Sequence, residues 1–137
     1  MKVGFTCGAF DLCHAGHALF FKEAKSLCDY LIVGLQTNPT IDRPDIKNKP
    51  IQTVEERYIQ LCSIKYIDRV IIYNTEKELY DLLVKLKPDI RFQGSDHKNK
   101  SYTGDDLSIK IHYHNRNYNW SSSELRKRIY DAENENH

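Results

Sequence analysis

The fold is decided by residues 3–35, which read VGFTCGAFDLCHAGHALFFKEAKSLCDYLIVGL. The stretch opens with a short apolar run, 3–6, that alternates like a strand, and residues 30–35 are apolar again. Between these runs, apolar residues from Phe20 to Cys28 recur at spacings of three and four, so they share one face of a helix. A strand, a helix and a strand within about thirty residues predict a βαβ unit.

Two histidines, His14 and His17, begin that helix with Gly16 between them. Residues three apart on a helix lie on the same side, so both imidazoles can face one pocket. The N-terminus of a helix carries free N–H groups and partial positive charge, which favour a bound phosphate. Because Gly16 lacks a Cβ, a ligand can approach the backbone closely. The pattern predicts a phosphate site with two imidazole donors. The alternative is that the histidines only cap the helix or lie on the surface.

The rest of the chain continues to alternate helices and strands. Capping boxes at Thr53 and Thr75 predict helices that run to about residues 66 and 86. Strands are expected at 69–73, 90–93 and 109–113, and a third capping box at Ser121 begins a last helix. This order predicts a single Rossmann-like α/β domain over residues 1–130, with a five-stranded parallel sheet and helices on both faces. Residues 131–137 are expected to form a polar, frayed tail.

Composition argues against several classes of function. The formal net charge is +1, so the chain has no general electrostatic attraction to nucleic acid or to a membrane surface. The sequence contains no apolar run long enough to span a bilayer and no signal peptide, and we therefore expect a cytoplasmic protein. The four cysteines form no C-x-x-C pair and are expected to be free thiols.

A zinc site is an alternative use of the same segment. Cys7, Cys13, His14 and His17 are zinc ligands by residue type. Their spacing follows no recognised structural zinc pattern, and Cys7 lies at the end of an expected buried strand. We therefore expect no metal site made by the protein alone.

The string HAGH at residues 14–17 resembles the His-x-Gly-His signature of the nucleotidylyltransferase superfamily. The preceding string GAFDL, at residues 8–12, is similar to the cytidylyltransferase branch, and most of all to the glycerol-3-phosphate cytidylyltransferases. The resemblance covers about residues 1–130, and its most specific parts are 14–17 and 116–123.

Several basic residues in the middle of the chain are candidates for contact with phosphates. The long loop 36–52 carries Lys47 and Lys49, and the resemblance implies that Lys47 contacts the nucleotide phosphates. Arg57 lies in the first turn of a helix, where the dipole disfavours a cation. It is therefore either paired with a carboxylate or a phosphate, or is a solvated surface residue. Lys65 matches a position that lies near the active site in the family.

The resemblance also assigns roles to residues near the ends of the last two strands. Asp96 ends the run Gly-Ser-Asp after the fourth strand, where open α/β sheets bind ligands, although such residues also form ordinary turns. Arg116 keeps the basic residue that precedes the last helix in the family, and Ser122 and Ser123 stand where many relatives have threonines. The hydroxyl groups that can bond to phosphate are thus retained.

The candidate site residues fall into three groups by role. The predicted catalytic residues are His14, His17, Lys47 and Arg116. The predicted nucleotide-binding residues are Ala9, Phe10, Asp11, His14, Gly16, His17, Lys47, Gly94, Asp96, Arg116, Trp120, Ser121, Ser122 and Ser123. The predicted acceptor-binding residues are Lys49, Arg57, Lys65 and Asp96.

The resemblance implies transfer of CMP from CTP to a small phosphorylated acceptor, glycerol 3-phosphate in the first instance, with release of pyrophosphate. Mg²⁺ is expected to arrive with the nucleotide, and a homodimer is expected. Loop 97–106 lacks the tryptophan that glycerol-phosphate relatives carry after Gly-x-Asp, and it is similar to loops of sugar-phosphate nucleotidylyltransferases. Two alternatives therefore remain. One is transfer of AMP from ATP to a sugar phosphate or a pantetheine-like acceptor. The other is a nucleotide- or zinc-binding protein without turnover.

Overall fold

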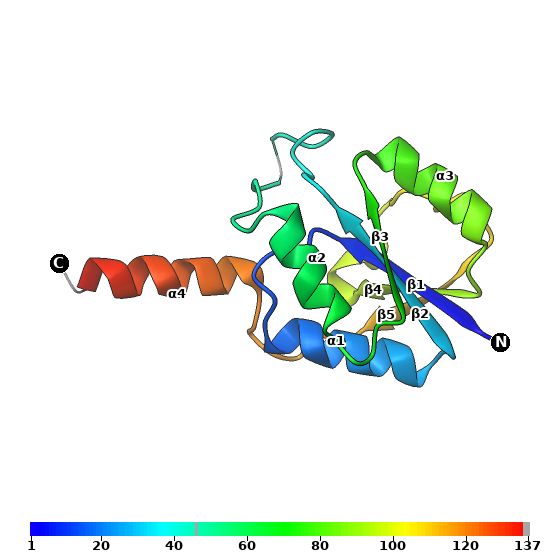
Figure 1. Cartoon of the computed structure of the whole chain (residues 1–137), viewed down its shortest axis with the longest axis horizontal. Helices are drawn as coiled ribbons and strands as arrows, with labels where there is room; N and C mark the ends of the chain where they lie inside the picture. Colours follow the sequence, from blue (N-terminus) through cyan, green and yellow to red (C-terminus); the bar gives the residue numbers. More distant parts are fainter. Residues whose placement is uncertain (46, 136–137) are drawn as a thin grey trace.

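Five parallel strands form one sheet in the order β3-β2-β1-β4-β5, and the chain is a single α/β domain (Figure 1). The computed structural model describes residues 1–45 and 47–135. The elements are β1 (Val3–Gly8), α1 (Ala15–Ser26), β2 (Tyr30–Gln36), α2 (Val54–Cys62), β3 (Arg69–Tyr73), α3 (Glu76–Leu86), β4 (Ile90–Gly94), the short helix η1 (Ser95–His97), β5 (Lys110–His114) and α4 (Ser122–Glu135). The fold predicted from the sequence is confirmed.

Two helix ends differ from the prediction. Helix α2 stops at Cys62 rather than near residue 66, because Ser63 bonds back to the carbonyl of Gln60 in a tighter turn. Helix α4 continues to Glu135, so the prediction of a frayed tail was wrong for 131–135, while residues 136–137 lie outside the described part. An ion pair one turn apart, between Lys127 and Asp131, supports the extension.

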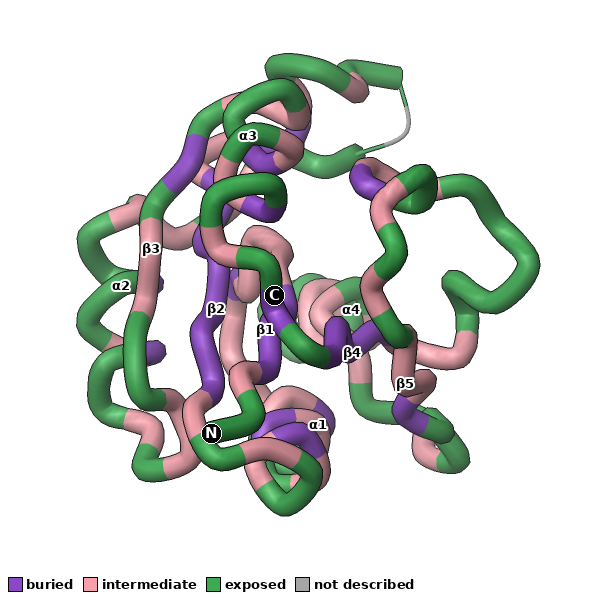
Figure 2. Tube along the Cα trace, turned by 90° about the vertical axis from the view of Figure 1, so that its right-hand side faces the viewer, coloured by how far each residue is buried: buried purple, intermediate pink, exposed green. Residues whose placement is uncertain are grey.

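Apolar side chains cover both faces of the sheet. One cluster joins α1 and α2 to the sheet, and it includes Phe21, Leu61 and Val33. The other cluster joins α3 to the opposite face and includes Phe5 and Leu79. Figure 2 shows β2 buried over most of its length. Burial on both faces explains why β2 reads as a continuous apolar run rather than an alternating one.

The order of the strands determines where a ligand site can form. From β1 the chain moves outward through β2 to β3, then crosses back through α3 to β4 on the other side of β1. The two halves of the sheet therefore diverge between β1 and β4. In open α/β sheets, ligands bind at such a point, beyond the carboxyl ends of the strands.

Arg57 ties together the loops at that edge, which corrects the expectation that it binds a substrate. Its side chain is only 2% exposed. The guanidinium donates to five backbone carbonyls, those of Ala9, Gln36, Thr37, Gln52 and Thr53. All three guanidinium nitrogens are thus used inside the protein, so Arg57 is neither a solvated residue nor a phosphate ligand. Its role is to hold the ends of β1 and β2 against the start of α2.

We predict that Arg57→Met destabilises the fold by about 3 kcal/mol or more, because buried carbonyl oxygens lose their donors. Chemical denaturation of the variant and the wild type measures this change. The matched control is Arg69→Met, at an exposed position on the edge strand β3, where a change within about 0.5 kcal/mol is expected. Equal stability of the two variants would contradict the structural role of Arg57.

Candidate nucleotide-phosphate site

A cavity of about 500 Å³ opens at the carboxyl edge of the sheet, between the loops that follow β1, β2, β4 and β5. It brings together residues that lie more than a hundred positions apart in the sequence. The predicted site residues that line it are Ala9, Phe10, Asp11, His14, Gly16, His17, Lys47, Gly94, Asp96, Arg116, Ser121, Ser122 and Ser123.

The two histidines cap α1 with one nitrogen each. The Nδ1 atom of His14 accepts a hydrogen bond from the backbone N–H of Gly16 at 3.0 Å. The Nδ1 atom of His17 accepts from the N–H of His14 at 3.2 Å. In a neutral imidazole whose Nδ1 accepts, the proton is on Nε2. Both predicted interpretations of the motif are therefore compatible: the rings cap the helix and still present Nε2–H groups as donors.

The surroundings keep both rings neutral near pH 7. Burial, together with the nearby His14 ring and the Arg116 cation, lowers the pKa of His17 from 6.5 to about 3. Burial, followed by the charge of Arg116, also lowers the pKa of His14. The two ring centroids lie 4.0 Å apart. A neutral pair can approach this closely, whereas two imidazolium cations would repel each other.

Gly16 is required by close packing around the histidines. A Cβ built at this position would lie 2.8 Å from Cε1 of His14 and 2.9 Å from Cε1 of Tyr118. The hydroxyl of Tyr118 donates to the carbonyl of Gly16 at 3.2 Å and lies 2.8 Å from Nε2 of His114. The ring of Tyr118 thus braces the first turn of α1 from the segment that precedes α4.

Sequence reasoning missed His114 and Tyr118. His114 is 6% exposed, and its Nδ1 lies 3.1 Å from Oε2 of Glu23 on α1. The contact between His114 and Glu23 links β5 to α1. No sequence motif indicates a contact between residues about ninety positions apart. A usable signal was the pair of aromatic residues Tyr118 and Trp120 beside the basic Arg116.

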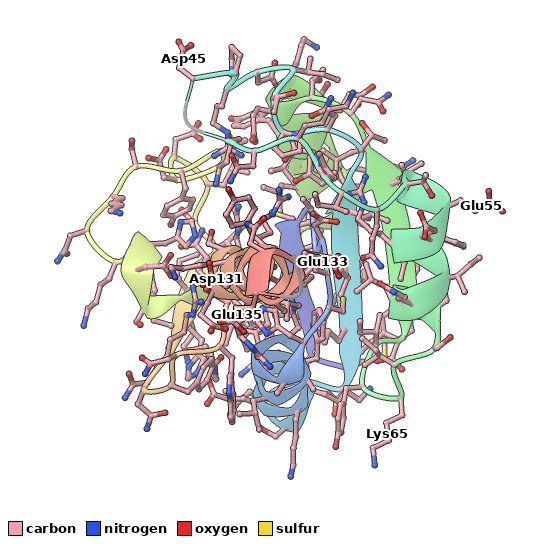
Figure 3. The ribbon with its side chains drawn as sticks, turned by 90° about the vertical axis from the view of Figure 1, so that its left-hand side faces the viewer. Asp45, Glu55, Lys65, Asp131, Glu133 and Glu135 are labelled. Carbon is pink, nitrogen blue, oxygen red and sulfur yellow. The ribbon has the colours of Figure 1, made fainter. Side chains whose placement is uncertain are left out.

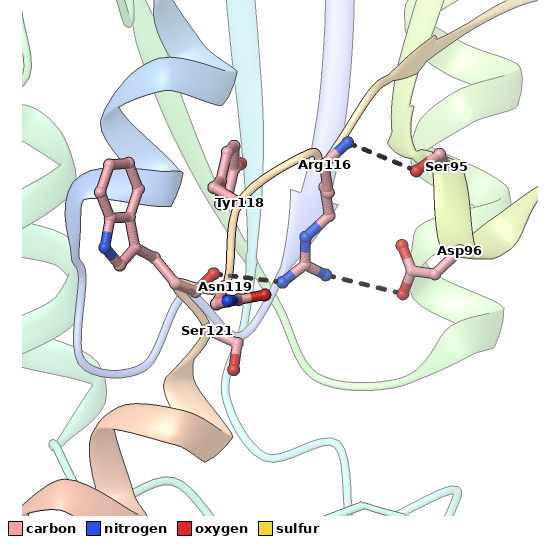
Figure 4. Close-up of a pocket in the computed structure, with 7 residues that line it drawn as sticks. Ser95, Asp96, Arg116, Tyr118, Asn119 and Ser121 are labelled. Carbon is pink, nitrogen blue, oxygen red and sulfur yellow. Dashed lines mark hydrogen bonds and ion pairs between the residues drawn. The ribbon is translucent and has the colours of Figure 1, made fainter.

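Arg116 lines both the main cavity and an adjoining hollow, and Figure 4 shows its side chain among the residues of that hollow, with its guanidinium directed toward Asp96. Its guanidinium is 3.7 Å from the carboxylate of Asp96 and donates to the carbonyl of Trp120 at 3.4 Å. These are long, weak contacts, so the cation remains free to bind an anion. Trp120 does not line the main cavity. It stacks on Tyr118 and borders an adjoining hollow of about 390 Å³.

The carboxylate of Asp11 forms its hydrogen bonds and its ion pair within the protein, so it is not available to a ligand. Its two carboxylate oxygens accept from the N–H groups of Ile51 and Gln52, and Arg126 forms an ion pair with it at 2.8 Å. Its carbonyl accepts from the hydroxyl of Ser122. The predicted nucleotide-binding role of Asp11 is therefore indirect: it fixes the first turns of α4 and the end of the long loop beside the cavity.

The predicted basic residues of the middle segment divide by position. Lys47 lies at the rim of the cavity, where burial and then the charge of Arg43 lower its pKa. Lys49 lines neither cavity of the described structure, and its backbone carbonyl accepts from Arg126. Lys65 follows α2 and points into solvent at the amino end of β3, as Figure 3 shows. The expectation that Lys65 binds the acceptor is wrong, because it lies at the opposite edge of the sheet.

Neither a metal cluster nor a membrane span is found in residues 1–45 and 47–135. No three His, Cys, Asp or Glu side chains there are gathered closely enough to hold a metal ion, so the zinc alternative has no site in that part of the chain. None of the helices described is both long enough and apolar enough to cross a bilayer.

The low pKa of His17 predicts a pH-dependent stability. Between about pH 6.5 and pH 3 the unfolded chain binds a proton at His17 that the folded protein does not. Stability is therefore fully present above pH 6.5 and falls as pH decreases, by at most about 1.4 kcal/mol per pH unit from this group. Gln at the third position of a helix can keep the capping bond but cannot titrate. Denaturation between pH 4 and pH 7 should give a steeper slope for the wild type than for His17→Gln, and identical slopes would contradict the assignment.

Comparison with known proteins identifies the family. A family model described as "Cytidylyltransferase-like" matches residues 5–128. The "Bifunctional protein HldE" of Campylobacter concisus is 34% identical over 134 residues, which cover 98% of this chain and 28% of that protein. The HldE protein of Helicobacter pylori strain 26695 is 34% identical over 93% of this chain and 28% of its own length. The chain thus spans little more than a quarter of these relatives.

Solved structures agree in fold. The lipopolysaccharide core biosynthesis protein of Thermoplasma volcanium superposes with a TM-score of 0.62 at 25% identity, over 96% of this chain and 88% of that chain. The pantoate-beta-alanine ligase of Francisella tularensis superposes with a TM-score of 0.58 at 20% identity, over 95% of this chain and 70% of that chain, and so shows the fold alone. This chain belongs to the cytidylyltransferase-like family and is a domain of the nucleotidyltransferase type.

Proposed function

We propose that this domain transfers a nucleotidyl group from a nucleoside triphosphate to a phosphorylated sugar and releases pyrophosphate. The observation that carries the proposal is the pair of neutral imidazoles at the start of α1, each with Nδ1 used by the backbone and Nε2–H left as a donor. Arg116 lines the same cavity and supplies a positive charge. Fixed donors and a cation in one cavity suit a phosphate chain.

The reaction needs positioning more than proton transfer. An oxygen of the acceptor phosphate attacks the α-phosphorus and forms a new P–O bond. The bond from the α-phosphorus to the bridging oxygen breaks, and pyrophosphate leaves with its electron pair. The attacking phosphate is already anionic at pH 7, so no general base is required. His14 and His17 would donate to oxygens of the transferring group, and Arg116 with the first turn of α4 would hold the leaving phosphates.

A protein-held magnesium ion does not fit the described site. No cluster of acidic side chains faces the cavity in the described residues, and the carboxylate of Asp11 is used by backbone N–H groups and Arg126. Mg²⁺ would instead arrive on the phosphates of the nucleotide, as hard cations do when a protein offers few oxygen ligands.

Among the acceptors, a sugar phosphate is favoured over glycerol 3-phosphate. Loop 97–106 departs from the glycerol-phosphate pattern, and a relative of 25% identity that spans nearly the same length is described as a lipopolysaccharide core biosynthesis protein. Of the alternatives drawn from the sequence, the one with a sugar-phosphate acceptor is transfer of AMP from ATP, and we therefore propose this pair of substrates over CTP with glycerol 3-phosphate. The expected homodimer remains a prediction, which sedimentation can test.

A pyrophosphate-release screen tests this function. ATP, CTP, GTP and UTP are each combined with pentose, hexose and heptose phosphates and with glycerol 3-phosphate. We expect the highest kcat/KM with ATP and a sugar phosphate. A preference for CTP with glycerol 3-phosphate would overturn the choice of substrates. Absence of release with every pair, in protein that binds a nucleotide by calorimetry, would favour a binding domain without turnover.

His14→Asn separates the two roles of the histidine. Asparagine is a good N-cap and can accept the N–H of the first turn, but it cannot place a donor where Nε2 lies. The thermal midpoint should therefore stay close to that of the wild type, while kcat falls by about a hundred- to a thousandfold and nucleotide affinity changes little. Equal losses in affinity and turnover would mean that the imidazole binds only the ground state.

A further inference from the structure

The half of the cavity that faces α3 contains three buried polar side chains that the phosphate site does not use. Gln36 ends β2, and Arg91 and Gln93 lie on β4; they are 1%, 4% and 8% exposed, and all three line the cavity. Successive residues of a strand point to opposite faces. Because Leu35 and Phe92 pack toward α1 and α2, these three polar residues lie on the α3 face of the sheet.

Each of these side chains has a polar atom without a hydrogen-bond partner in the described structure. The atoms are Nε2 of Gln36, Nε of Arg91 and Oε1 of Gln93. An unpaired buried polar group costs about 1–3 kcal/mol, and such groups are uncommon in folded proteins. Three of them beside one cavity indicate a ligand that supplies the missing partners. Two are donors and one is an acceptor, so the ligand must both accept and donate hydrogen bonds.

Arg91 adds a requirement for negative charge. It donates to the carbonyl of Thr103, lies 3.5 Å from the sulfur of Cys7 and sits over the ring of Tyr102 at 5.0 Å. These neutral contacts fix its position. Within the described part of the chain, no carboxylate forms an ion pair with it. A buried cation without a carboxylate partner is stabilised when an anion binds nearby.

The rim of this half also offers positive charge and hydroxyls. Arg43 forms an ion pair with Glu76 at 2.8 Å, its Nε is also unpartnered, and it lines the cavity beside Lys47. Thr103 donates to Glu76, which connects the rim to the loop held by Arg91. The lining thus combines amide groups, which suit hydroxyls, with cations, which suit phosphate.

We infer that this α3-side half, with Gln36, Arg91 and Gln93, is the acceptor subsite, and that its ligand is a sugar phosphate. The two glutamines bind sugar hydroxyls, one as donor and one as acceptor, and Arg91 balances the anionic charge. The inference rests on the proposed function, and it replaces Lys49, Arg57 and Lys65 as acceptor contacts.

Calorimetry with a non-hydrolysable ATP analogue present tests the subsite apart from turnover. The probes are pentose, hexose and heptose phosphates and glycerol 3-phosphate. Gln36→Met and Gln93→Met keep the side-chain volume and remove the amide. Each variant should therefore bind the best sugar phosphate with about three- to tenfold lower affinity than the wild type. The affinity for glycerol 3-phosphate should fall by a smaller factor, because this acceptor has fewer hydroxyls than a sugar phosphate. Affinity for the ATP analogue alone should not change.

Gln60→Met is the matched control. Gln60 lies on α2 away from the cavity and also carries an unpartnered Oε1, so the same substitution there should leave acceptor affinity unchanged. Thermal melts check that each variant folds. Arg91→Met should lower the affinity for the sugar phosphate about tenfold to a hundredfold. If this variant does not fold, the affinities of the two glutamine variants test the inference.

Three outcomes would overturn the inference. These are wild-type acceptor affinity in both Gln36→Met and Gln93→Met, an equal loss in Gln60→Met, or failure of the wild-type protein to bind any sugar phosphate. The first two outcomes leave the proposed function intact, because nucleotide binding and pyrophosphate release in the wild type decide it separately. The third would also remove sugar phosphates as acceptors, whereas pyrophosphate release with another acceptor would keep nucleotidyl transfer itself.

Discussion

The buried guanidinium of Arg57 is the constraint on which the site depends. Three loops meet at its donors: the one after β1, the one after β2, and the one that leads into α2. Carbonyl groups of such loops need donors once they are removed from water, and one planar cation with five N–H groups satisfies them together. With the loops fixed, the open edge of the sheet has a defined shape, and α1 and α4 can present their first turns to the same cavity.

The start of α1 shows how one residue type serves both structure and chemistry. An imidazole has two nitrogens with different roles, and here the inner one replaces the Ser, Thr or Asp oxygen of an ordinary N-cap. The outer nitrogen must then carry the proton, so capping selects the tautomer that can donate to phosphate. Burial and the neighbouring cation prevent a second proton from binding. Folding thus sets the protonation state of the site before any ligand arrives.

Local sequence patterns predicted the sheet and the first part of the site well. The alternation of apolar runs and capping boxes determined nearly every strand and helix, and the His-x-Gly-His string indicated its own pocket. The failures concern long-range contacts. From the sequence, Arg57 could only be described as a cation in the first turn of a helix. Its five carbonyl partners were not predictable, because several come from segments that only the folded sheet brings near. The prediction for Lys65 failed for a related reason. A residue's nearness in sequence to a motif does not determine at which edge of the sheet its loop lies. Gln36 and Gln93 likewise line one cavity only because β2 and β4 flank β1 in the sheet.

Helix α4 extends from the body of the domain into solvent, and none of its residues is buried (Figure 1). Its attachment lies close to the cavity, through Ser122 and Arg126 on Asp11. A helix of 14 residues is about 21 Å long, so a tilt of about 10° at its base moves the far end by about 4 Å. The geometry therefore gives α4 the form of a lever arm: a small tilt at its base would produce a displacement large enough for a fluorophore at its tip to report.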